Sequence, residues 1–298
     1  MEYIIEEIDF ENRETIQQSL CLLKKVFNKT FFTEKWWYWK FLSSPFGKAI
    51  GWLARDRNSN TIVALRILWK WKFTNGIESI DAYQMIDTAT DTSFRGKGLF
   101  SQLTMFALKK LNYPLIFNFP NEKSSPLYLK LGWRTMKQQS TLYRIVNPLT
   151  SKNGRSGYMS EIPEMILKSI TNRSMDKSFH TNYTIDFFKW RFCNHPYTIY
   201  FYFSYETTLF IYRIDKVRGI NNALIMYVYN YTESAFRIFS KLLFWKGVYL
   251  IRYNALNNKV YEKWSKYSCV LKHGTLSFFT CNNEIYELSL LPSDTDFW

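Results

Sequence analysis

The chain has 298 residues, of which 47% are hydrophobic and 21% are charged, a composition that is typical of a globular protein and excludes a disordered one. This length suits two domains of ordinary size. The formal net charge is +14, but Lys and Arg are scattered and form no block of like charges. The pattern favours a basic solvated surface over a dedicated nucleic-acid-binding face, although it does not exclude nucleic acid as a partner.

The predicted elements of the first half follow one another as strands and helices. Apolar residues recur at helical spacing at Ile16, Leu20, Leu23 and Phe27, and again from Leu99 to Leu111. Strands are predicted for residues 50–54, 61–73, 80–90 and 114–119, and a short helix for residues 124–132. The expected fold class is α/β, in the sense of a mixed α+β sheet flanked by helices.

The second half repeats features of the first. At an offset of 151 residues, "WKFLSSP" from Trp39 aligns with "WRFCNHP" from Trp190, and this match favours a packing role for Trp39. Further along, "IVALRI" resembles "LFIYRI", and "LYLK" resembles "VYEK", in the same order. We therefore expect two copies of one fold, as domains 1–148 and 149–298, joined near the turn-rich stretch "NPLTSKNGRSG".

No metal site or membrane span is expected. Cysteine lies at positions 21, 193, 269 and 281, and histidine at 180, 195 and 273, with no metal-ligand spacing. Scattered cysteines predict reduced thiols in a cytoplasmic protein. The acidic segment "MEYIIEEIDFENRET" lacks the basic start of a signal peptide. The most apolar run, residues 197–214, carries charges and predicts two strands instead of a membrane span.

The stretch "DTSFRGKGLFSQL" places Arg95-Gly96-Lys97-Gly98 between a predicted strand and a predicted helix. A helix N-terminus presents unpaired N–H groups and partial positive charge, and preceding glycines let an anion approach the backbone. Arg95 and Lys97 add formal charge. The pattern matches neither GxxxxGK[ST] nor GxGxxG, so it predicts a phosphate-binding turn of another kind, with a plain glycine turn as the alternative.

Together with "FNFPNEKSSPLYLKLGW", this stretch resembles the GNAT superfamily of N-acetyltransferases over residues 1–146. The resemblance implies two tandem GNAT-like acyltransferase folds with central, mostly antiparallel sheets. It also implies acetyl-coenzyme A (acetyl-CoA) as the acyl donor, with no metal. The donor-binding residues implied by the resemblance are Thr88, Ala89, Thr90, Phe94, Arg95, Gly96, Lys97, Gly98, Leu99, Phe100, Asn121 and Ser125.

The resemblance assigns the oxyanion of the reaction to backbone N–H groups at Thr88 to Thr90, and the leaving thiolate to the phenol of Tyr128. Asp87 is the candidate base, acting through water, with a hydrogen-bonding role at the strand end as its alternative. A bulge is expected in this strand, so the sequence does not predict on which face of the sheet the Asp87 side chain lies. Asn121 and Ser125 either bind the pantetheine amides or cap the following helix.

The second half lacks the glycine turn, because "VYNYTESAFRIF" stands in its place and puts Glu233 near the expected phosphate position. It is therefore expected to bind no coenzyme A. The predicted function is acetyl transfer from acetyl-CoA to a primary amine of a small acceptor, such as an amino sugar used in surface-polysaccharide synthesis. Two alternatives remain open: a Fem-like transferase that uses aminoacyl-tRNA, and a non-catalytic module that binds acyl-CoA. The sequence does not determine the oligomeric state.

Overall fold

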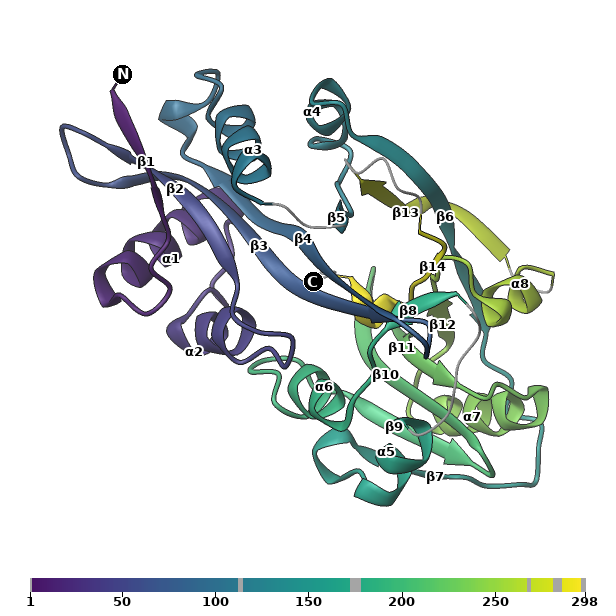
Figure 1. Ribbon diagram of the computed structural model, residues 1–298. Helices are drawn as coiled ribbons and strands as arrows, with labels where there is room; N and C mark the ends of the chain where they lie inside the picture. The colour runs from purple at the N-terminus through teal and green to yellow at the C-terminus, as the bar shows by residue number, and fades with distance from the viewer. Residues whose placement is uncertain (1, 112–114, 172–177, 267–268, 281–285, 296–298) are drawn as a thin grey trace. The chain divides into compact units, whose positions relative to one another are not determined.

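The computed structural model describes residues 2–111, 115–171, 178–266, 269–280 and 286–295 (Figure 1). The chain forms two compact units. Unit 1 contains residues 1–73, 78–136 and 278–285, and unit 2 contains residues 74–77, 137–277 and 286–298. The units are not two consecutive halves, because a segment of each half belongs to the unit built mainly by the other. The division of the chain into two copies of one fold, residues 1–148 and 149–298, stays a prediction.

Unit 1 contains the elements predicted for the first half. The helices are α1 (Arg13–Phe27), α2 (Glu34–Trp37), α3 (Leu99–Lys110) and α4 (Ser125–Lys130), and a π-helix spans Tyr38–Leu42. The strands are β1 (Tyr3–Glu7), β2 (Ile50–Asp56), β3 (Ile62–Thr74), β4 (Ser79–Thr90) and β5 (Leu115–Asn118). The sequence-based helices and strands of this half are confirmed.

The sheet of unit 1 has the order β1-β2-β3-β4-β5. β1 pairs with β2 and β2 with β3 in antiparallel fashion, whereas β4 and β5 are parallel. The end of β13 (Cys269–Thr280) adds an antiparallel partner to β5 through Phe279 and Thr280. Phe279 then packs in the same core as Trp52, Leu103 and Tyr128. The second half of the chain therefore completes both the sheet and the core of unit 1.

Unit 2 is built around the strands β6-β12-β11-β10-β9-β7, which are hydrogen-bonded neighbours in that order and belong to the same sheet as the strands of unit 1. Its strands are β6 (Arg134–Ile145), β7 (Arg155–Tyr158), β9 (Phe201–Tyr205), β10 (Thr208–Val217), β11 (Ile220–Tyr229) and β12 (Leu250–Tyr253), with β8 (Phe179–Thr181) paired to β14 (Leu288–Ser289). Its helices are α5 (Glu164–Thr171), α6 (Ile185–Phe188), α7 (Glu233–Trp245) and α8 (Lys259–Ser265). The pairs described here are antiparallel except β11 with β12 and β8 with β14, so the expectation of mostly antiparallel sheets is confirmed.

The repeated sequence has the same local structure in both copies. Thr33 and Thr184 each cap a four-residue helix by accepting the N–H of the residue three positions on. Each helix passes directly into a π-helix, Tyr38–Leu42 or Lys189–Cys193. Trp39 and Trp190 are buried in their own units, as the packing prediction requires. The matching local structure supports the interpretation that the chain contains two copies of one fold. That interpretation stays a prediction.

Candidate active site

The glycine turn leads from β4 into α3. After a short 3-10 turn (Thr92–Phe94), Gly96 and Gly98 have φ angles of 79° and 76°, in the left-handed region that disfavours side chains. A Cβ on Gly96 would meet nothing within 4 Å, and one on Gly98 would meet only the end of the Gln102 side chain, at 3.5 Å. The glycines are therefore required by the backbone conformation, and the space beside the turn is open.

The turn presents an exposed and basic surface. Arg95, Gly96, Lys97 and Gly98 are all exposed. Because α3 begins at Leu99, the N–H groups of its first turn have no intrahelical partner and carry partial positive charge. The ammonium of Lys97 pairs with Glu2 at 2.5 Å, and both side chains are solvent-accessible, so this pair can open for a stronger anion. The arrangement suits a phosphate or pyrophosphate.

Asp91 anchors the start of the turn. Its carboxylate accepts the N–H of Ser93 at 3.0 Å and pairs with the ammonium of Lys25 at 2.6 Å. The hydrogen bond from Lys25 holds the pKa of Asp91 below its usual value. The backbone N–H of Asp91 donates to Val63 on β3 at 2.8 Å. The turn is thus tied to α1 and β3 before the chain reaches the glycines.

The end of β4 extends past its parallel neighbour. The register between β4 and β5 runs from Ala82 opposite Leu115 to Gln84 opposite Phe117, and β5 ends one residue later, whereas β4 continues to Thr90. Ala89 is buried, and Thr88 and Thr90 are half-buried. The predicted oxyanion-binding segment therefore lies in the part of β4 that runs beyond β5.

Tyr128 is buried and faces the interior of unit 1. Its hydroxyl oxygen accepts a hydrogen bond from a guanidinium nitrogen of Arg66 at 2.7 Å, and its own proton is directed toward the sulfur of Met85 at 4.0 Å. Its ring packs against Trp133 and against Phe100, in the first turn of α3, with centroid distances of 4.8 and 5.4 Å. Tyr128 therefore has a packing role in this core, which is the alternative to catalysis for a tyrosine on a short helix, and its catalytic role stays a prediction.

Arg66 is a residue of the site that sequence reasoning missed. Its side chain is fully buried, and it donates to Tyr128, to Thr88 Oγ1 at 2.6 Å and to Thr104 Oγ1. Its guanidinium lies 4.4 Å from the ring centroid of Phe100. No carboxylate lies within ion-pair distance of Arg66 in the part of the chain that the structure describes. The sequence feature that could have revealed Arg66 is its position as an arginine within the apolar strand "IVALRILW".

Asp87 interrupts the regular geometry of β4. Its φ of 44° lies in the left-handed region, consistent with the irregular strand expected from the resemblance. Its carboxylate pairs with the ammonium of Lys40 at 2.6 Å, and both side chains are largely withdrawn from solvent. Lys40 lies in the first π-helix, with its ammonium 5.0 Å from the ring centroid of Trp36. The role of Asp87 as a base stays a prediction, whereas its ion pair with Lys40 is observed.

Asn121 and Ser125 are hydrogen-bonded within the turn that precedes α4. The side-chain oxygen of Asn121 accepts the N–H groups of Lys123 and Ser124 at 3.1 and 3.0 Å. The Ser125 hydroxyl donates to the Asn121 carbonyl at 2.8 Å. The N-cap residue of α4 is Ser124, which makes no side-chain capping bond, so these bonds shape the turn before the helix. Both alternatives for Asn121 and Ser125, capping and contact with a pantetheine arm, stay predictions.

The corresponding helix in unit 2 begins differently. Thr232 caps α7 by accepting the N–H of Ala235 at 3.2 Å. Glu233 accepts a hydrogen bond from Tyr231 at 2.6 Å and pairs with Arg144 at 3.2 Å. A side chain thus occupies the place that an anion would take, and a carboxylate lies beside it. This geometry agrees with the expectation that the second copy binds no phosphate at this helix.

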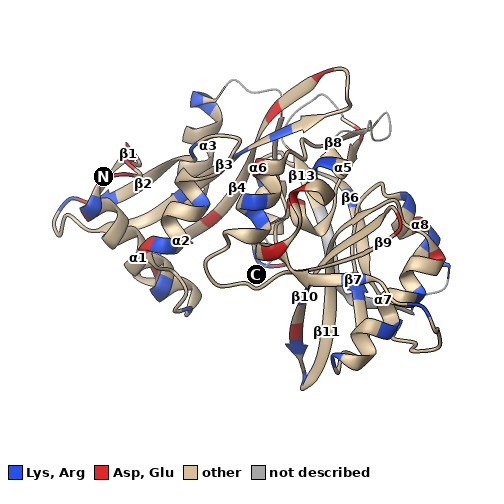
Figure 2. Ribbon diagram, turned by 90° about the horizontal axis from the view of Figure 1, so that it is seen from below, with Lys and Arg blue, Asp and Glu red and all other residues tan. Residues whose placement is uncertain are grey.

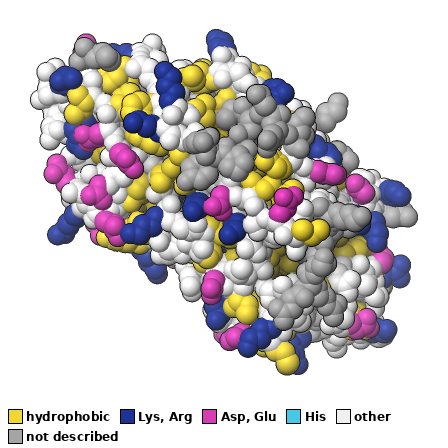
Figure 3. Space-filling model, viewed as in Figure 1, with side chains coloured by type: hydrophobic (Ala, Val, Ile, Leu, Met, Phe, Trp, Pro, Cys, Tyr) yellow, Lys and Arg dark blue, Asp and Glu magenta, His cyan; other side chains and the backbone are white. Residues whose placement is uncertain are grey.

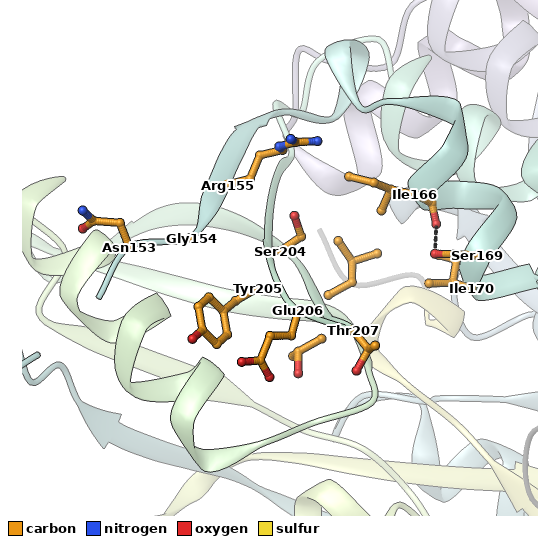
Figure 4. Close-up of a pocket in the computed structure, with 12 residues that line it drawn as sticks. Asn153, Gly154, Arg155, Ile166, Ser169, Ile170, Ser204, Tyr205, Glu206 and Thr207 are labelled. Atoms are coloured by element: carbon orange, nitrogen blue, oxygen red, sulfur yellow. Dashed lines mark hydrogen bonds between the residues drawn. The ribbon is translucent and has the colours of Figure 1, made fainter. Parts of the chain in front are cut away.

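Unit 2 contains a separate cavity of about 370 Å³ between β7, α5 and the β9–β10 turn (Figure 4). Arg155, Ser204, Glu206 and Thr207 contribute polar groups to its wall, and Ile166 contributes apolar surface. None of the predicted site residues lines it. The cavity therefore belongs to a different part of the molecule from the glycine turn.

Charge elsewhere is dispersed. Lys and Arg side chains are spread over the face shown in Figure 3 and do not gather into one basic patch. Across the described ranges, no helix is both long and apolar enough to cross a membrane, and no three His, Cys, Asp or Glu side chains are grouped as metal ligands.

No protein-family model matches the sequence, and no curated protein sequence matches it. Solved structures do match. A conserved protein of unknown function from Enterococcus faecalis, described as a probable N-acyltransferase, has a TM-score of 0.65 at 12% identity, with 94% of this chain and 72% of that chain covered. A GCN5-related N-acetyltransferase from Anabaena variabilis has a TM-score of 0.67 at 9% identity, with 93% and 72% covered.

This chain has a GNAT-like fold. The N-myristoyltransferase of Saccharomyces cerevisiae, solved with myristoyl-CoA, is also similar, with a TM-score of 0.59 at 9% identity over 96% of this chain and 80% of that chain. The GNAT-like fold is thus confirmed, and the likeness extends over nearly the whole chain.

Proposed function

We propose that this chain is an acyl-CoA-dependent N-acyltransferase whose donor is acetyl-CoA and whose acceptor is a small primary amine. The observation that carries the proposal is the exposed glycine turn at the start of α3, next to the part of β4 that extends past β5. The two named N-acetyl- and N-acyltransferases with similar folds support the proposal. An amino sugar is the proposed acceptor class, carried over from the sequence resemblance.

The residues present fit a coenzyme A donor. N–H groups from Gly96 to Phe100 would hold the pyrophosphate, and Arg95 and Lys97 would add charge to this site. The backbone of the β4 end would receive the pantetheine arm, because β5 stops before it. When bound, the donor supplies a thioester carbonyl for attack by the amine.

Three groups would then handle charge and protons. Backbone N–H groups at Thr88 to Thr90 would stabilise the oxyanion, a contribution of about 3–4 kcal/mol where one such donor has been removed. Asp87 would take a proton from the acceptor ammonium through water, while Lys40 keeps its carboxylate in place. Attack by the amine would form the C–N bond. As the C–S bond then breaks, Tyr128 would give its proton to the departing sulfur, and the proton that the new amide nitrogen loses would return to the phenolate through solvent.

The first test is isothermal titration with acetyl-CoA of the wild type and of Arg95→Glu. We expect binding that weakens at least about tenfold in the variant, because a carboxylate would face the pyrophosphate. Arg237→Glu is the matched control, since it makes the same charge change at an exposed position of α7. Equal affinity of all three proteins, or no binding by the wild type, would contradict the donor site.

The second test distinguishes acetyl-CoA from a longer acyl-CoA as the donor, and acetyl transfer from the two alternative functions. Turnover with an amino-sugar panel is measured with acetyl-CoA and with myristoyl-CoA, because an N-myristoyltransferase is among the similar structures. Transfer of the acetyl group supports the proposal. Transfer of the myristoyl group alone would show that the donor is a long-chain acyl-CoA instead of acetyl-CoA. Binding without turnover supports the non-catalytic module, and binding of charged tRNA with steep salt dependence supports the aminoacyl transferase.

A further inference from the structure

One end of the unit 2 sheet carries a continuous set of exposed apolar side chains. Ile220 and Val217 flank the β10–β11 turn, Phe244 and Trp245 end α7, Tyr249 precedes β12, and Ile145 ends β6. We call these six residues the apolar rim. Trp245 is 74% exposed and Ile145 is 78% exposed, and it is the grouping of such side chains in one patch that is informative. The other four are also exposed.

The hydrogen bonds and strand register place these segments together. The amide N–H of Tyr249 donates to the carbonyl of Asn221, and the side-chain amide of Asn221 donates to the carbonyl of Gly247. Val146 donates its N–H to Tyr249, and Leu250 lies opposite Ile145 in the sheet. The hairpin tip, the end of α7 and the end of β6 therefore meet at one edge of unit 2.

The rim is bordered by positive charge. Lys216 and Arg218 lie at the hairpin tip, and Lys246 follows Trp245; all three are exposed. Figure 2 shows the β10–β11 hairpin reaching the lower edge of the view, with basic residues on it. Asp215, an acidic residue near the hairpin tip, is paired with Arg213 at 3.1 Å and with Arg252 at 2.5 Å. The net charge around the rim is therefore positive.

We propose that the apolar rim is a docking surface for a membrane that contains anionic lipid. Trp and Tyr favour the boundary between headgroups and acyl chains, and neighbouring Lys and Arg are attracted to anionic headgroups. Shallow insertion of aliphatic and aromatic side chains adds affinity in proportion to the apolar area buried. Symmetric pairing of two copies would instead place Lys216, Arg218 and Lys246 against their own counterparts, which opposes a dimer at this surface.

The test is flotation of the full chain with vesicles of phosphatidylcholine alone and of phosphatidylcholine mixed with phosphatidylglycerol. We expect binding to the mixed vesicles that decreases with salt. Trp245→Ser should weaken binding about tenfold or more, since it removes the largest inserted side chain. Arg218→Glu/Lys246→Glu should weaken binding to mixed vesicles and leave the small background on neutral vesicles unchanged.

Met165→Ser is the matched control. Met165 is 75% exposed, close to the value for Trp245, but it lies on α5, which lines the cavity at the opposite end of β10. We expect wild-type binding from this variant. Failure of the wild type to float, or equal loss in the Met165 and Trp245 variants, would overturn the proposal. A dimer in light scattering that Trp245→Ser dissociates, without vesicle binding, would assign the rim to a second copy of the chain.

Discussion

Arg66→Met tests whether the buried guanidinium orients Tyr128 for catalysis. In the wild type, Arg66 donates to Tyr128 at 2.7 Å and to Thr88 at 2.6 Å. The hydrogen bond occupies a lone pair of the Tyr128 oxygen, and the phenolic proton consequently points away from Arg66. Methionine fills a similar volume but donates no hydrogen bond. The Tyr128 hydroxyl would then lose the partner that fixes its orientation.

The expected effect is large on the reaction and small on stability. Hydrogen bonds from a charged donor contribute about 1.5–3 kcal/mol each, so losing the three that Arg66 donates favours unfolding. Removal of a buried charge that has no carboxylate partner among the described residues offsets much of this loss, and we expect the free energy of unfolding to change by less than about 2 kcal/mol. Misplacement of a proton donor lowers kcat by about 10²-fold, the lower end of general acid–base contributions.

The assay compares single-turnover acetyl transfer with acetyl-CoA affinity. We expect the rate of Arg66→Met to fall about 10²-fold while the dissociation constant stays within about threefold, because Arg66 is fully buried and contacts side chains of Thr88 and Phe100, whereas the donor is proposed to bind backbone N–H groups. Thr104→Val is the control, since Thr104 accepts a hydrogen bond from Arg66 without a hydrogen bond to Tyr128. A rate for Arg66→Met within about threefold of wild type would refute the orienting role.

Three further predictions follow from the geometry. Gly98→Val should weaken acetyl-CoA binding and destabilise the fold by about 1–3 kcal/mol, as titration and urea unfolding would show, because a β-branched residue is strained at a φ of 76°; unchanged values would contradict this. Lys40→Met should lower the free energy of unfolding by about 3–5 kcal/mol, because it removes the buried ammonium that pairs with the Asp87 carboxylate at 2.6 Å; a loss below about 1 kcal/mol would show that the pair contributes little. Burial raises the pKa of Asp294 to about 6, so the folded state binds this proton more tightly than the unfolded state, and the contribution of Asp294 to stability is lost as pH rises from about 4 to 6. Urea unfolding across this range should show that loss in the wild type relative to Asp294→Asn, and parallel pH profiles would contradict it.

The sequence by itself determined the local elements of this protein and the place of its glycine turn. Apolar residues at helical spacing predicted α1 and α3, and short runs rich in β-forming residues predicted β2 to β5, because the spacing and residue types of each segment follow from the geometry of that one element. The turn at Gly96 and Gly98 was predictable because left-handed backbone favours glycine whatever surrounds it. The repeated "W-[KR]-F-x-x-x-P" pattern likewise marked two segments with the same caps and π-helices.

Only the tertiary structure decided which residues distant in the sequence come into contact. Arg66 and Tyr128 are 62 positions apart, and no local rule indicates that the arginine turns inward onto the tyrosine. Lys40 reaches Asp87 in the same way, through packing of a π-helix against β4. The addition of β13 to β5 depends on which sheet edge best buries Phe279, since strand pairing is chosen by long-range packing and by the available edge, neither of which leaves a pattern in the local sequence.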